Sequence, residues 1–126
     1  HLIARLAGAE LRVVHVIPDI TELRYKMAIL PGERLLSDSI QHNERRLQEY
    51  LGQFQLHDVV HKAEVLLGKS GSVLVDYLQQ EEIDLVVMGT GTSYRIAGYP
   101  IGSNTHRVLT QSLASVCVVR SLEPAP

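Results

Sequence analysis

Glycine and hydroxyl residues gather in the C-terminal third of the chain, with a spacing that suits an anionic ligand. The apolar run Asp84 to Met88 leads into Gly89-Thr90-Gly91-Thr92, and Gly102-Ser103-Asn104-Thr105 opens the next expected helix. In open α/β sheets, ligands bind beyond the carboxyl ends of the strands, where glycines let backbone amides approach phosphate and a helix N-terminus adds positive charge. The stretch predicts a phosphate site; the alternative is that these glycines make only a turn and a helix cap.

Two other nucleotide-binding patterns are incomplete. Gly68-Lys69-Ser70 follows an apolar run as a P-loop does, but a P-loop needs a glycine five residues earlier, where Ala63 stands. Gly89-Thr90-Gly91 has Tyr94 in place of the third glycine of a dinucleotide fingerprint, and it follows a late strand rather than the first. We therefore expect neither site and interpret Lys69 as a solvated loop residue.

Metal-binding and nucleophilic groups are poorly supported. His57 and His61 have the spacing of a helical metal pair, but no Glu lies between them and the stretch is typical of a loop that enters a strand. Cys117 is the only cysteine and alternates with apolar neighbours, which indicates a buried, inert thiol. A single cysteine excludes an internal disulfide and fits a reducing compartment such as the cytoplasm. We expect no catalytic residue and no metal ligand.

Two alternating apolar periods predict the elements that must position the glycine stretch. Nearly continuous β-branched runs are typical of buried parallel strands, and apolar residues at helical spacing indicate helices. The expected strands are residues 11–17, 62–67, 84–88 and 115–119. The first expected helix is a helix end that starts at Leu2 and stops at a left-handed cap, Gly8. The others are residues 33–54, with Phe54 facing inward, residues 70–80, and residues 103–111. Ser70 or Ser72 is expected to cap the helix at 70–80. Residues 94–101 are expected to be a loop. This order predicts an α/β fold with an open parallel sheet and helices on both faces.

Length, composition and charge limit the classes of function. A chain of 126 residues, 45% hydrophobic and 21% charged, suits one compact domain, which we expect over residues 1–121 with a tail at 122–126. A formal charge of -2 gives no general attraction to phosphate backbones or anionic lipids. The apolar runs fall far short of the roughly 20 residues that span a bilayer. We therefore expect neither nucleic acid nor a membrane as a partner.

The glycine spacing and its context resemble the universal stress protein family. Nucleotide-binding members carry Gly, two residues, Gly, nine residues, then Gly and Ser or Thr after the fourth strand. Here the matching frame is Gly89 to Thr92, the nine residues 93–101, and Gly102-Ser103. Thr92 stands where the family has its second glycine, next to Gly91, and residues 96–105 look like the variant loop of tandem-type members. The resemblance spans nearly the whole chain.

The resemblance implies a Rossmann-like fold of the adenine nucleotide alpha hydrolase type and a site for ATP or another adenine nucleotide, with Mg²⁺ possible beside it. The residues that it implies for this site are Ile17 near the adenine, Met88, Gly89, Gly91, Thr92, Gly102, Ser103 and Asn104. It also implies a homodimer formed through an edge strand that carries Val116, Val118 and Val119.

The chain starts near the end of the family's first helix, after the first strand and its nucleotide-contacting Asp. In the family that strand lies in the middle of the sheet, between the strands that match residues 11–17 and 84–88. We therefore expect further sequence upstream, and we expect residues 11–17 and 84–88 not to pair directly.

The sequence leaves three candidate functions for this chain. The first is a stress-response or signalling module that binds an adenine nucleotide and hydrolyses it slowly at most. The second is a non-nucleotide dimerisation or ligand-sensing domain in which the glycine loop is structural, an alternative that Thr92 keeps open because threonine disfavours positive φ. The third, an electron-transfer or adenylate-using enzyme, rests on fold analogy alone and lacks a catalytic cluster.

Overall fold

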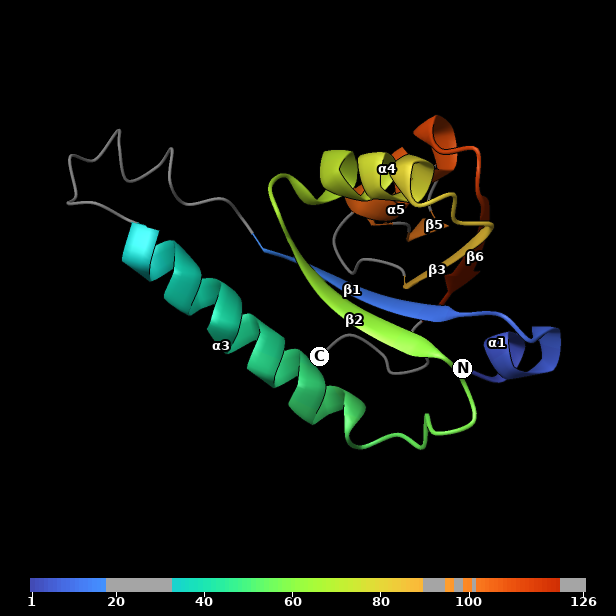
Figure 1. Cartoon of the computed structure of the whole chain (residues 1–126). Coiled ribbons are helices and arrows are strands. Elements are labelled where there is room, and N and C mark those ends of the chain that lie inside the picture. The colour runs from blue at the N-terminus through green and yellow to red at the C-terminus, as the bar shows by residue number, and fades with distance from the viewer. Residues whose placement is uncertain (18–32, 90–94, 97–98, 101, 121–126) are drawn as a thin grey trace. The chain divides into compact units, whose positions relative to one another are not determined.

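The computed structural model describes residues 1–17, 33–89, 95–96, 99–100 and 102–120 (Figure 1). The chain divides into two compact units, His1–Gly68 and Lys69–Pro126. Each unit builds a two-stranded parallel sheet and places helical residues beside it. The chain therefore has the predicted α/β class, with its parallel strands in two pairs.

The first unit contains α1 (Leu2–Ala7), β1 (Leu11–Ile17), α3 (Glu33–Leu51) and β2 (His61–Leu67). β1 and β2 pair in parallel along their whole length, and α3 runs beside them (Figure 1). Their ladder is extended at the carboxyl end by the Gly68 amide, which donates to the Ile17 carbonyl at 3.0 Å. Among the described residues of this unit, the buried apolar side chains are Ile17, Leu51, Leu56 and Val59.

Two features of the first unit test the sequence patterns. Gly8 caps α1 in the left-handed conformation, with φ 63, as predicted from a glycine that ends an apolar stripe. The prediction that α3 continues inward to Phe54 is wrong. α3 ends at Leu51, next to Gly52, and Phe54 is 50% exposed with its ring edge-on to Tyr50 at 5.2 Å. Because Gly52 is a weak helix former, the helix ends at Leu51, although the helical spacing of apolar residues continues to Phe54.

The second unit contains α4 (Ser70–Gln80), β3 (Leu85–Gly89), β4 (Arg95–Ile96), β5 (Tyr99–Pro100), α5 (Ser103–Gln111) and β6 (Ser115–Val119). β3 and β6 pair in parallel from Leu85↔Ser115 to Gly89↔Val119. α4 and α5 lie side by side (Figure 1), and Tyr77, Leu78 and Val108 are buried.

Three expectations for the second unit are corrected. β3 ends at Gly89 rather than Met88, so the first glycine of the motif belongs to the sheet ladder. The stretch expected to be a loop holds a short antiparallel pair, β4 with β5. Neither Ser70 nor Ser72 caps α4, because the cap position is Lys69 and no side chain caps it. The Ser72 hydroxyl instead accepts a hydrogen bond from Arg107.

The parallel strands form one pair within each unit. Among the described residues, β1 pairs with β2 and β3 pairs with β6. The expectation that residues 11–17 and 84–88 do not pair directly stays a prediction, because these strands belong to different units. The expectation of an additional strand stays a prediction.

Candidate functional site

A buried threonine joins the end of β3 to the start of α5. Thr105 lies in the first turn of α5 and is 2% exposed. Its hydroxyl Oγ1 donates to the carbonyl oxygen of Gly89 at 2.9 Å. The two ends of the glycine motif, which are separated by the whole glycine loop in sequence, are therefore held together by one side chain.

At the N-terminus of α5, no side chain of the described residues caps the backbone amides. Gly102 is the cap residue, in an extended conformation with φ -61 and ψ 149, and it has no side chain to accept a hydrogen bond. The first intrahelical bond of this turn runs from the His106 amide to the Gly102 carbonyl at 2.9 Å. The amides before it lie outside the helical ladder, and the first turn holds no acidic residue. This end of the helix is suited to an anion.

A second tie holds α5 against α4. The Arg107 Nη1 atom donates to the Ser72 hydroxyl at 2.6 Å, so its side chain crosses the first turn of α4. Gly71 makes room for this crossing, because a Cβ there would meet Arg107 Cδ at 2.6 Å. Val108, on the same helix, is 0% exposed. The orientation of α5 within the second unit is thus set from the strand side and from the helix side.

The predicted site residues fall into three groups. The first group lies at the end of β3, with Met88 and Gly89, and at the start of α5, with Gly102, Ser103 and Asn104; the Thr105 bond joins these two segments. Ile17 is buried at the end of β1 and belongs to the first unit. Gly91 and Thr92 lie outside the described residues.

Thr105 is the residue that the motif search missed. The pattern stops at the glycine and the hydroxyl residue after it, here Gly102 and Ser103. The available signal was a β-branched polar residue in the first helical turn, three positions after the cap glycine, where its hydroxyl can reach back toward the preceding strand. Its near-complete burial could not be read from the sequence, because threonine is usually exposed.

The other candidate residues gain little support as ligands. The His61 Nδ1 atom lies 3.0 Å from the Val59 carbonyl oxygen, within its own chain segment. In the part of the chain that the structure describes, no three His, Cys, Asp or Glu side chains gather as a metal site. Cys117 is half-buried rather than fully buried. Lys69 is exposed, as predicted.

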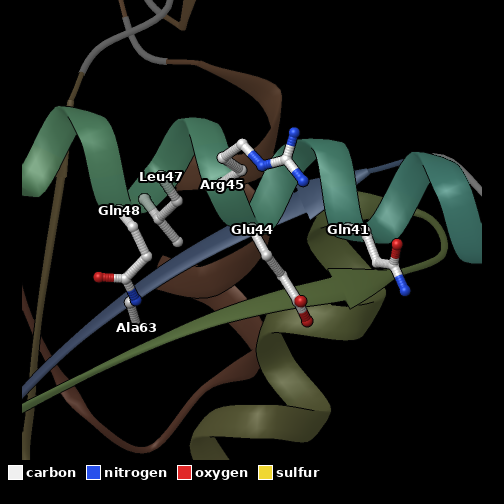
Figure 2. A pocket seen from close by; sticks show the side chains of 6 residues that line it. All are labelled: Gln41, Glu44, Arg45, Leu47, Gln48 and Ala63. Atoms are coloured by element: carbon white, nitrogen blue, oxygen red, sulfur yellow. The ribbon is translucent and has the colours of Figure 1, made fainter.

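A hollow of about 490 Å³ lies between α3 and β2 in the first unit (Figure 2). Glu44 and Gln48 extend from α3 toward the strand, where Ala63 lies. A second hollow, of about 550 Å³, lies in the second unit around Leu78, Ile83 and Leu113. None of the predicted site residues that the structure describes is among those lining either hollow.

Comparison with known proteins identifies the family. A family model of the universal stress proteins matches residues 2–120. The chain belongs to the universal stress protein family. No curated protein sequence matches it significantly. Within the described residues of this universal stress protein, no helix has the length and apolar character that crossing a membrane requires.

Solved structures support the same fold. The hypothetical protein MJ0577 is 18% identical, with a TM-score of 0.65, 98% of this chain covered and 89% of that chain. The hypothetical protein PH0823 is 17% identical, with a TM-score of 0.68 and coverage of 92% and 78%. The universal stress protein UspA from Lactobacillus plantarum is 22% identical, with a TM-score of 0.64 and coverage of 94% and 83%. At these identities the likeness concerns the fold.

Proposed function

We propose that this universal stress protein binds ATP or another adenine nucleotide and acts as a stress-response or signalling module in the cytoplasm. The observation that carries the proposal is the uncapped amide end of α5, held at the end of β3 by Thr105. Phosphate would lie against Gly89, Gly102, Ser103 and Asn104, with Met88 toward the base. Gly91 and Thr92, which lie between these ends in sequence, and Ile17, which belongs to the first unit, are included on the family resemblance alone. Backbone amides at a helix N-terminus supply both hydrogen-bond donors and a positive potential to such a group.

The proposal includes little or no catalysis. The described ends of the site, Gly89 and residues 102–104, carry no carboxylate or imidazole to activate water. Mg²⁺ binds phosphate oxygens together with carboxylates and water. Since the first turn of α5 holds no acidic residue, Mg²⁺ at this turn would rely on the nucleotide and on water for its ligands. We expect hydrolysis to be slow at most.

The test is calorimetric titration with ATP of the wild type, Gly102→Asp and Lys69→Ala. A carboxylate at the cap of α5 would occupy or repel the phosphate position, so Gly102→Asp should weaken binding by tenfold or more, about 1.4 kcal/mol. Lys69 is exposed at the start of α4, and Lys69→Ala should leave the affinity within about twofold, less than 0.5 kcal/mol. Equal losses in the two variants would refute this assignment.

The second candidate is a dimerisation or ligand-sensing domain with a structural glycine loop. The observation that favours it is Thr92, which replaces the family's second glycine with a residue that disfavours positive φ. The nucleotide content of the purified protein separates the two candidates. Adenine nucleotide released on denaturation supports the first, whereas its absence together with no heat of ATP binding supports the second.

A further inference from the structure

Thr105 is the one buried polar side chain among the described residues. A hydroxyl that is 2% exposed loses its water, so leaving it without a protein partner would be costly. Its bond of 2.9 Å to the Gly89 carbonyl meets this requirement. The Thr105–Gly89 hydrogen bond is therefore a structural contact of the second unit, and not an incidental contact at the surface.

The bond fixes one element of the proposed site against the other. Gly89 is itself held in the sheet, where it lies opposite Val119 in the parallel register. Thr105 is one residue beyond Asn104, so whatever holds Thr105 also places the amides of Ser103 and Asn104. The offset between the strand end and the amide-bearing turn is thus set by a single hydroxyl.

The other contacts of α5 do not replace this bond. Val108 packs by shape, and apolar contacts tolerate small shifts along the helix axis more readily than a directional hydrogen bond does. Arg107 reaches α4, not β3, through an exposed hydrogen bond. Thr105 provides the tie to β3 that sets the first turn.

We propose that Thr105 is a positioning residue that makes the site selective for phosphate-bearing nucleotides over nucleosides. This inference rests on the proposed function. Thr105 need not touch the ligand, since its own hydroxyl is occupied by Gly89. It acts by keeping the turn's amides where phosphate oxygens can accept from them, because such bonds weaken steeply with distance and angle.

Three variants isolate the hydroxyl. Thr105→Val keeps the branched shape and removes the donor, whereas Thr105→Ser keeps the donor and removes a methyl group. Thr110→Val is the matched control on the same helix. The exposed hydroxyl of Thr110 bonds to carbonyls of its own helix, those of His106 at 3.0 Å and Arg107 at 3.2 Å. Thr105→Ala replaces Thr105→Val if the valine variant does not fold.

The first measurement is amide hydrogen exchange in the absence of nucleotide. We expect the His106 amide, which closes the first turn onto Gly102, to exchange faster in Thr105→Val than in the wild type or Thr110→Val. Thr105→Ser should restore its protection. Unchanged exchange in Thr105→Val would overturn the positioning role, whether or not the protein binds a nucleotide.

The second measurement is titration with ATP and with adenosine. We expect Thr105→Val to weaken ATP binding about tenfold, as loss of one well-placed hydrogen bond to a charged group would, and to leave adenosine binding unchanged. Equal losses for both ligands, or no loss for ATP, would overturn the selectivity. A wild type that binds neither ligand removes the proposed function and the selectivity with it, and the exchange result then decides the positioning role alone.

Discussion

Gly71 and Arg107 approach each other closely in the second unit. Arg107 crosses α4 where a Cβ on Gly71 would lie 2.6 Å from Cδ and 3.2 Å from Nε. Gly71 itself is buried at the start of α4, where glycine is a poor helix former. The glycine thus weakens the helix and makes possible the hydrogen bond to Ser72.

We expect the effect of Gly71→Ala to depend on Arg107. In the wild type, the new methyl group displaces the Arg107 side chain, which offsets the gain in helix propensity of up to about 1 kcal/mol. In Arg107→Ala the gain should remain, so Gly71→Ala should raise the free energy of unfolding. Urea unfolding of the four proteins measures the coupling. Additive effects within about 0.3 kcal/mol would show that the contact is not a constraint.

At the same scale, the sequence predicted part of the site. Glycines at fixed spacing after an apolar strand indicated the end of β3 and the start of α5, and the structure has both elements. The Thr105 hydroxyl bond and the Arg107 crossing could not be predicted, because each joins residues distant in sequence whose side-chain directions depend on packing. The roles of Gly91 and Thr92 in the site stay predictions.

At the scale of elements, local patterns predicted regular segments well. β1, α5 and β6 have the predicted bounds, since a strong apolar period and nearby breakers act within a few residues. Errors arose where tertiary contacts decide. Phe54 fits the α3 period but follows the helix end, and the Ser72 hydroxyl bonds to Arg107 instead of capping α4. The β4–β5 pair has only two residues in each strand, too short for a period.

We expect the packing of α5 to depend on one buried apolar side chain, that of Val108. Val108 is 0% exposed, whereas its larger neighbour Leu109 is 43% exposed. Val108→Ala should lower the free energy of unfolding by about 1–3 kcal/mol, because it removes buried methyl groups and leaves a cavity. Leu109→Ala, measured by the same urea unfolding, should cost less than about 1 kcal/mol. If the leucine variant costs more, the burial order within α5 is wrong.

At the scale of the whole molecule, each two-stranded parallel sheet has strands with one side that no other described strand pairs with. β6 pairs with β3 along one side, and among the described residues no strand pairs with its other side. Val118 and Val119 are 36% and 51% exposed on this strand. Apolar edge strands tend to recruit further strands, and proteins usually cover them. The homodimer through Val116, Val118 and Val119 stays a prediction.

We therefore expect the protein to be a dimer at micromolar concentration and expect Val119→Lys to shift it toward the monomer. A lysine on an edge strand disfavours strand addition because pairing would bring its charge close to apolar neighbours and its own copy. Val60→Lys is the control, since Val60 is 75% exposed and lies outside β6. Sedimentation velocity gives the masses, and circular dichroism checks that both variants fold. A monomeric wild type, or equal dissociation in the two variants, would contradict a β6 interface; a dimer lost in Val119→Lys alone would show that association is a property of this edge.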